Sequence, residues 1–289
     1  PELTMLAYTK RHPLALHLAF VLLLGVPVLV AGCDNSVDIL DRDTGLYSVY
    51  GALDINAEIN SIRVKNLNTP LVDDSTRTLD ATVTLENRRT GTSQVLKDSI
   101  VQFENVYTHN FRTTMPINPD TKYRLTVKHP DGRTAQATAT TPPLAETNVN
   151  PRGKACETPI RIAFEPVASP KNLEPEIGFE IDGQRRWTPA FRPRSNESNA
   201  DLVFVQFTPK QLLDAVFKPD SPLGGQEVWC HELDSNTLFV RYTHLGPDFS
   251  GDTPSDSLNV PGGLGQFGGY YEDSFTFKID TMNVCAPFC

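Results

Sequence analysis

The chain has 289 residues, enough for one large domain or two ordinary ones, and its formal net charge at pH 7 is −9. Because neutralising phosphates requires clustered cations, and the sequence has no long run of Lys or Arg, we expect no binding to nucleic acid. Hydrophobic residues make up 39% of the chain, which predicts packed cores rather than global disorder.

The N-terminal segment has the layout of a cleavable export signal. A basic triplet at 10–12 precedes an almost wholly apolar run over residues 13–32. The run ends in Val-Ala-Gly-Cys33, which resembles the bacterial lipobox, a signal whose cysteine is acylated and becomes the new N-terminus. We therefore predict a signal peptide over residues 1–32 and a membrane-anchoring lipid on Cys33. Pro27 and the small residues before Cys33 argue against the alternative, an uncleaved membrane-spanning helix.

The next two segments read as a tether and a first domain. Residues 33–45 are polar and acidic, which predicts a lipidated tether. Over residues 46–142, short segments such as Ser61–Lys65 and Tyr123–Lys128 alternate polar and apolar residues and are separated by turn residues. About seven strands without a strong helix predict an immunoglobulin-like or fibronectin-like β-sandwich.

A second β-rich domain is predicted over residues 156–289, after a Pro- and Asn-containing linker at 143–155. It contains several strand candidates and one short helix near residues 209–217. The segment Thr208–Gln211 has the pattern of a capping box that starts this helix. We expect the helix to cover an open side of a sheet with an apolar face formed by Leu212, Leu213, Val216 and Phe217.

The four cysteines after Cys33 all lie in the second half of the chain. An even number of cysteines in an exported chain favours disulfides over metal ligation. All three pairings remain open, and sequence proximity favours Cys285–Cys289 with Cys156–Cys230. A Cys-x3-Cys pair can also bind metal, but no adjacent histidine pair completes a zinc site. We expect no metal and no cofactor.

Five glycines between Gly262 and Gly269 allow two interpretations. A phosphate-binding loop would need Lys and Ser or Thr after the glycines, and here two tyrosines and a glutamate follow. We therefore interpret the glycines as structural, at bends, bulges or close backbone contacts in a sheet corner. The functional alternative is an aromatic platform that stacks on a sugar or a peptide, formed by Trp187, Phe267, Tyr270 and Tyr271.

The other polar residues form no recognisable catalytic pattern. The histidines form no metal-binding pair, and neither a Gly-x-Ser-x-Gly nor a His-Glu-x-x-His motif is present. Asp248, Asp252 and Asp256 recur in a Gly- and Pro-containing loop, but their spacing does not match an EF-hand, so we interpret them as solvated. These observations disfavour an enzyme.

Several stretches resemble a known family. Tyr123–Val127, Asp131–Ala135 and Ala139–Pro143 look like the end of its first domain, and Asn259–Gly269 resembles its Asn-Ile-x-Gly-Gly-Leu-Gly-x-Phe-Gly signature, with Val in place of Ile and Pro in the variable position. This is the family of Bacteroidota lipoproteins catalogued as domain of unknown function 4249. The resemblance, which would cover the whole chain after the signal peptide, implies an outer-membrane lipoprotein facing the periplasm or the cell surface, often associated with a TonB-dependent receptor.

Together these features favour a lipid-anchored cell-envelope protein. We expect it to bind a glycan or peptide ligand, or to assist a TonB-dependent outer-membrane transporter. One alternative is a structural or adhesive surface protein in which the first sandwich acts as a spacer. A secreted hydrolase is a third alternative, disfavoured by the missing catalytic motifs.

Overall fold

The computed structural model describes residues 46–68, 78–103, 106–151, 158–188, 191–217, 233, 235–248 and 259–279. All of them fall within one compact unit, Asp43–Cys289. The predicted signal peptide and tether, including Cys33, and the four disulfide candidates lie outside the described residues, so the structure does not test them.

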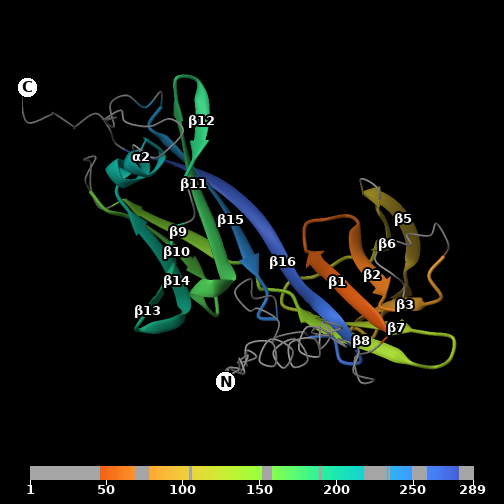
Figure 1. Cartoon of the computed structure of the whole chain (residues 1–289). Coiled ribbons are helices and arrows are strands. Elements are labelled where there is room, and N and C mark those ends of the chain that lie inside the picture. The colour runs from red at the N-terminus through yellow and green to blue at the C-terminus, as the bar shows by residue number, and fades with distance from the viewer. Residues whose placement is uncertain are drawn as a thin grey trace, which may run out of the picture. The chain divides into compact units, whose positions relative to one another are not determined.

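The described chain is mainly β, which confirms the predicted fold class (Figure 1). The largest sheet consists of β1 (Tyr47–Asp54), β2 (Asn60–Asn66), β5 (Lys97–Phe103), β6 (Val106–Thr113), β11 (Leu173–Ile181), β12 (Gln184–Trp187), β15 (Thr237–Leu245) and β16 (Gly263–Lys278). Its eight strands have the spatial order β12-β11-β15-β16-β1-β2-β6-β5.

Two four-stranded sheets complete the architecture. One has the order β4-β3-β7-β8 and consists of β3 (Thr82–Asn87), β4 (Ser93–Val95), β7 (Lys122–Lys128) and β8 (Thr134–Thr140). The other has the order β13-β14-β10-β9 and consists of β9 (Glu146–Pro151), β10 (Ile160–Glu165), β13 (Arg194–Asn196) and β14 (Asn199–Phe207). The helical elements among the described residues are a 3-10 turn, η1 (Pro170–Asn172), and one α-helix, α2 (Pro209–Phe217).

The first core lies between one part of the eight-stranded sheet and the sheet of β3, β4, β7 and β8. The predicted alternation is confirmed: Ile62 and Val64 are buried while Arg63 between them is exposed, and Tyr123, Leu125 and Val127 are buried on the facing strand. Each strand therefore contributes one apolar face to a sandwich and turns its other face outward.

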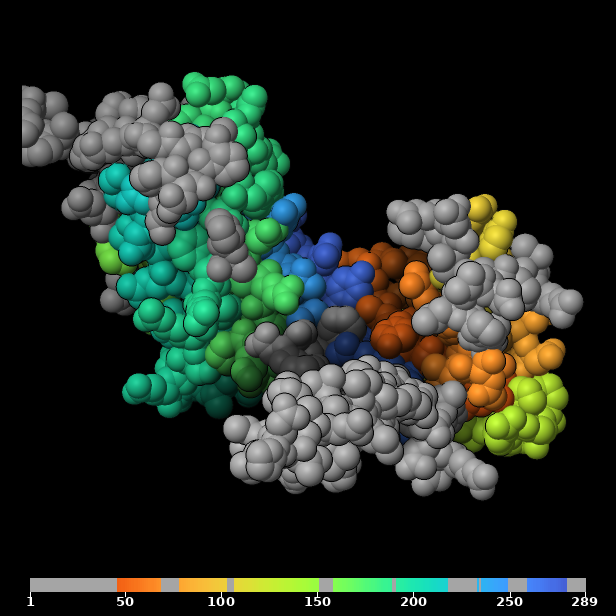
Figure 2. All heavy atoms as spheres, viewed as in Figure 1, coloured from red at the N-terminus to blue at the C-terminus, as the bar shows by residue number. Residues whose placement is uncertain are grey.

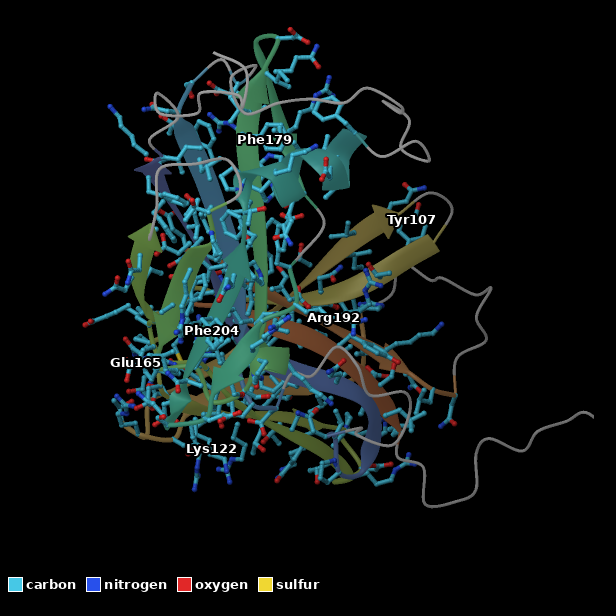
Figure 3. All side chains as sticks on the ribbon, turned by 90° about the vertical axis from the view of Figure 1, so that its left-hand side faces the viewer. Tyr107, Lys122, Glu165, Phe179, Arg192 and Phe204 are labelled. Atoms are coloured by element: carbon cyan, nitrogen blue, oxygen red, sulfur yellow. The ribbon has the colours of Figure 1, made fainter. Side chains whose placement is uncertain are left out.

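The second core joins β11, β15 and the far end of β16 to the sheet of β9, β10, β13 and β14. Helix α2 covers it, as predicted. The capping box is formed, since the Gln211 backbone N–H donates to Thr208 Oγ1 at 3.1 Å and the Thr208 N–H donates to Gln211 Oε1 at 2.9 Å. Phe217 at the end of the helix packs against Phe179 of β11, with ring centroids 6.5 Å apart. Figure 3 labels Phe179.

Strand β16 runs through both cores, and this differs from the predicted domain boundaries. It pairs in parallel with β1 over Gly263–Tyr270 and antiparallel with β15 over Tyr270–Lys278. Figure 2 shows its blue atoms lying against the orange atoms of β1 and β2. The C-terminal segment thus completes the first sandwich. The expected linker at 143–155 contains β9, which pairs with β10.

The Gly-rich segment is the first half of β16, a central strand rather than a sheet corner. Close backbone contact, one of the predicted reasons for its glycines, is confirmed. Gly265 has a φ of +119°, and a Cβ at this position would overlap the carbonyl oxygen of Val49. A Cβ on Gly263 would lie 2.5 Å from the carbonyl oxygen of Tyr47. The glycines therefore allow the parallel pairing with β1.

Candidate functional site

The structure does not assemble the predicted aromatic platform. Phe267 is 0% exposed and belongs to the first core, whereas Tyr271 is 3% exposed and belongs to the second. Both rings pack inside the protein, because the alternation along β16 turns them toward the sandwich interiors. Neither ring is available for stacking on a ligand, so this prediction is wrong for both.

Trp187 and Tyr270 are also engaged by the protein itself. Trp187 ends β12, where a Cβ on Gly178 would come within 2.9 Å of its ring, and the Arg241 guanidinium lies 4.3 Å from its ring centroid. Tyr270 is half-buried, and burial together with the nearby charge of Asp54 raises the pKa of its hydroxyl. Both side chains are thus partly buried, and other residues of the protein lie beside them.

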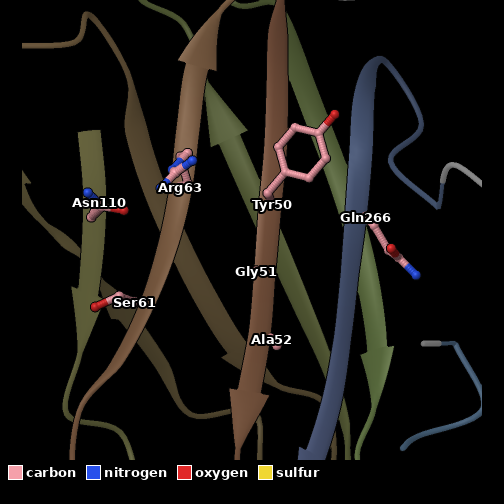
Figure 4. A pocket seen from close by; sticks show the side chains of 7 residues that line it. All are labelled: Tyr50, Gly51, Ala52, Ser61, Arg63, Asn110 and Gln266. Atoms are coloured by element: carbon pink, nitrogen blue, oxygen red, sulfur yellow. The ribbon is translucent and has the colours of Figure 1, made fainter. Parts of the chain in front are cut away.

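A different surface carries an open pocket of about 400 Å³, on the outer face of the eight-stranded sheet (Figure 4). Four neighbouring strands, β16, β1, β2 and β6, supply its walls. The lining residues are Tyr50, Gly51, Ala52, Ser61, Arg63, Asn110 and Gln266. Concave sites with a few convergent polar groups are typical of ligand binding.

The strand register sets four of these side chains in one row. Tyr50 lies opposite Gln266 on β16 and Arg63 on β2, and Arg63 lies opposite Asn110 on β6. Residues directly opposite each other project from the same face of a sheet. The small side chain of Ala52, two residues beyond Tyr50, leaves open the space beside the tyrosine ring.

Tyr50 is available to a ligand through its exposed ring, whereas the Asn110 amide is held in place by hydrogen bonds. Tyr50 is 55% exposed, although Val49 and Leu53 on the same strand are almost fully buried. Its ring offers an apolar surface with a polar tip. The Asn110 side-chain nitrogen donates to the hydroxyl and the carbonyl oxygen of Thr108, at 2.9 and 3.2 Å, which fixes the orientation of the amide.

Cations lie on one side of the pocket, on β2, β6 and β5. Arg112 on β6 lies opposite Ser61 and also opposite Lys97 on β5, and Lys65 lies two residues beyond Arg63 on β2. None of these four cations forms an ion pair with any residue that the structure describes. Arginines elsewhere do pair with carboxylates, at positions 88, 89, 124, 133, 185 and 241. We call Arg63, Lys65, Lys97 and Arg112 the cationic cluster.

The described histidines away from this face either lie beside a carboxylate or are buried. His109 Nδ1 lies 2.7 Å from Asp98 Oδ2, and His129 Nδ1 lies 2.8 Å from Asp131 Oδ1. Hydrogen bonds from Arg133 hold the pKa of the Asp131 carboxyl well below its usual range. His244 is 2% exposed, and burial lowers its pKa to about 4.

Within the described ranges, no group of three or more His, Cys, Asp or Glu side chains is placed to hold a metal ion. Of the loop aspartates, Asp248 accepts a hydrogen bond from the Thr140 N–H at 2.8 Å, while Asp252 and Asp256 lie outside the described residues. No helix in the described part of the chain has the length and apolarity required to cross a membrane.

Sequence reasoning did not single out the pocket residues. The alternation of polar and apolar residues over Ser61–Lys65 places Arg63 on the polar face of its strand, and this pattern is the feature of the sequence that pointed to a pocket residue. The pairing of β1 with β16, which brings Gln266 beside Tyr50, joins segments about two hundred residues apart. Such a register cannot be read from local patterns.

The family model described as "Domain of unknown function (DUF4249)" matches residues 34–169. This part of the chain belongs to that family, which confirms the family resemblance, although the match ends before the signature-like segment at 259–269. No curated protein matches the chain.

Among solved structures, pullulanase from Anoxybacillus sp. LM18-11 shows 10% identity and a TM-score of 0.22 over 68% of this chain and 24% of that one. The same enzyme complexed with maltotriose gives the same values. The chain thus spans about a quarter of the pullulanase it matches, and a likeness this low carries no information on fold or activity.

Proposed function

We propose that the chain is a lipid-anchored binding protein of the bacterial cell envelope. Its ligand would contact the outer face of β16, β1, β2 and β6. The observation that carries the proposal is the pocket in which Tyr50, Arg63 and Asn110 lie in one row, with Tyr50 and Arg63 exposed. The lipobox-like sequence ending at Cys33 supports the anchor and an outer-membrane location, facing the periplasm or the cell surface.

The pocket favours binding over catalysis. Its lining contains one cation and several neutral polar groups, but no carboxylate, histidine or cysteine among the described residues that form it. General acid–base or nucleophilic hydrolysis needs such groups within hydrogen-bond reach of the substrate. Side chains of Ser, Asn, Gln and Tyr provide donors and acceptors for recognition instead.

A binding array tests the proposal. Purified full chain would be applied to arrays of neutral glycans, acidic glycans and peptides, together with the variants Tyr50→Ala and Leu144→Ala. Leu144 is a suitable control because it is as exposed as Tyr50, at 55%, and does not line the pocket. We expect saturable binding to at least one ligand class, abolished by Tyr50→Ala and unchanged by Leu144→Ala. An absence of saturable binding would favour the structural or spacer role.

The family assignment supports an extension to a transporter partner. We propose that the lipoprotein accompanies a TonB-dependent outer-membrane receptor and delivers or retains its ligand there. Affinity purification of the native lipoprotein from outer membranes should recover such a receptor in stoichiometric amount. Recovery of the lipoprotein without any receptor would contradict this extension and leave the binding function intact.

A further inference from the structure

Two arginines of the cationic cluster lie on neighbouring strands, Arg63 on β2 and Arg112 on β6. Arg63 lies opposite Asn110, and Arg112 lies opposite Ser61, so the two arginines are diagonal neighbours on one face. Diagonal neighbours in paired strands lie about 7–8 Å apart, within reach of long side chains. Two arginines at this spacing can hold one carboxylate or sulfate between them by charge-assisted hydrogen bonds.

The charge on this face is polarised. The cationic cluster lies on β2, β5 and β6, whereas Asp54 and Glu272 mark the other side, near the end of β1 and on β16. In a chain of net charge −9, cations on one side of a pocket that pair with no carboxylate among the described residues select for an anion and fix its orientation. A ligand would place its negative group toward Arg63 and Arg112.

Neutral polar groups and one aromatic ring occupy the space next to the cations. Ser61 and Gln266 each offer both a donor and an acceptor, and Asn110 offers its side-chain oxygen as an acceptor because its nitrogen already donates to Thr108. These groups match the hydroxyl groups of a saccharide. The exposed ring of Tyr50 stands between Gln266 and Arg63 and offers a flat apolar surface for the C–H face of a sugar ring.

A peptide fits this surface less well. The strands β16, β1, β2 and β6 are all interior strands, paired on both sides, so their backbone groups are used within the sheet. Peptide recognition by strand addition requires a free sheet edge. Recognition here must rely on side chains, which favours a ligand rich in hydroxyl groups.

We infer that the pocket binds an acidic saccharide, a hydroxylated sugar ring bearing a carboxylate or sulfate, with the anionic group on Arg63 and Arg112 and the ring on Tyr50. This inference rests on the proposed binding function and specifies its ligand class. Carboxylated and sulfated sugars share this chemistry, and the probes described next distinguish them.

Calorimetric titration of the full chain tests the inference with four probes. These are trigalacturonic acid, its methyl ester, a sulfated galactose trisaccharide and a tetraglutamate peptide. The methyl ester keeps the rings and removes only the charge. We expect one or both acidic saccharides to bind at least tenfold more tightly than the methyl ester and the peptide. Their affinity should fall several-fold when salt rises from about 0.02 to 0.3 M.

Three variants localise the binding. Arg63→Gln should weaken the acidic saccharide by about tenfold or more, because a charge-assisted hydrogen bond is lost. Tyr50→Ala should weaken both the acidic saccharide and any residual binding of the ester. Lys122→Gln removes the same charge from an exposed position on β7 that does not line the pocket, and it should leave affinity unchanged. Figure 3 labels Lys122. Unfolding curves confirm that each variant is folded.

Each outcome decides the question. Equal binding of the ester and the acid, or equal binding of tetraglutamate, would overturn the inference, and in either case the binding function would stand. An equal loss of affinity in Arg63→Gln and Lys122→Gln would show a general charge effect and also overturn it. If none of the four probes binds while the array finds another ligand, the inference fails alone. If the array is also empty, both proposals fail.

Discussion

Replacing His244 should change how the stability of the fold depends on pH. His244 lies on β15 at 2% exposure, its ring centroid is 5.5 Å from that of Tyr271, and its Nδ1 has no hydrogen-bond partner among the described residues. Burial lowers its pKa from 6.5 to about 4, so the folded state holds the neutral imidazole. The depressed pKa means that the unfolded chain takes up a proton first as the pH falls.

The magnitude follows from linkage. Above pH 6.5, the pKa of the residue in the unfolded chain, His244 does not change the free energy of unfolding with pH. Below about pH 4, the destabilisation that it causes has reached its full value. Between these two pH values the free energy of unfolding should fall by about 3 kcal/mol, since each unit of difference between the folded and unfolded pKa corresponds to about 1.4 kcal/mol. By about pH 5, roughly 2 kcal/mol of this loss should have occurred.

Urea unfolding at about pH 8 and about pH 5 measures this loss. The variant His244→Gln cannot titrate in this range, so its free energy of unfolding should fall by roughly 2 kcal/mol less than that of the native chain between the two pH values. Comparing slopes rather than absolute stabilities removes the cost of the substitution itself and the contributions of other carboxylates and histidines. Identical slopes in the two proteins would refute the assignment of a buried neutral imidazole.

Three further changes test other parts of the structure. Gly265→Ala should destabilise the fold by roughly 3 kcal/mol or more, because its Cβ would overlap the Val49 carbonyl oxygen. Gly91→Ala, also at positive φ but with open space around it, should cost only about 1 kcal/mol, and equal losses in chemical denaturation would contradict the close-contact explanation. Thr208→Ala should cost about 1 kcal/mol through loss of the helix cap, whereas an unchanged unfolding midpoint would show that the cap contributes nothing. Mass spectrometry should find Cys33 acylated and N-terminal, and an unmodified residue would rule out the lipid anchor.

The local features of the fold were predictable from sequence. The alternation at Ser61–Lys65 and the capping box at Thr208 both specify structure through contacts within a few residues, and both are formed. Of the structural reasons predicted for the glycines of the C-terminal segment, close backbone contact is confirmed, at Gly265 for example, whereas the predicted sheet corner is a central strand. Steric and capping effects of this kind act locally, so a single sequence reveals them.

The long-range pairings were not predictable in the same way. The alternation in β16 shows that Phe267 faces one side of the strand, but not that β1 pairs beside it and that β8 packs over it to bury the ring. The pairing of β1 with β16 brings residue 266 beside residue 50, and the pairings of β1 with β2 and of β2 with β6 add residues 63 and 110 to the pocket. The cationic cluster was missed because its members are spread from residue 63 to residue 112 and only the register of β2, β6 and β5 brings them together.

A crystal structure of the chain with trigalacturonic acid tests the proposed binding face most directly. We expect a carboxylate oxygen within hydrogen-bonding distance, about 2.7–3.2 Å, of the Arg63 guanidinium, and a sugar ring packed on the face of Tyr50. A saccharide bound elsewhere on the molecule, with the pocket between β16 and β6 empty, would contradict the assignment of this surface as the binding site.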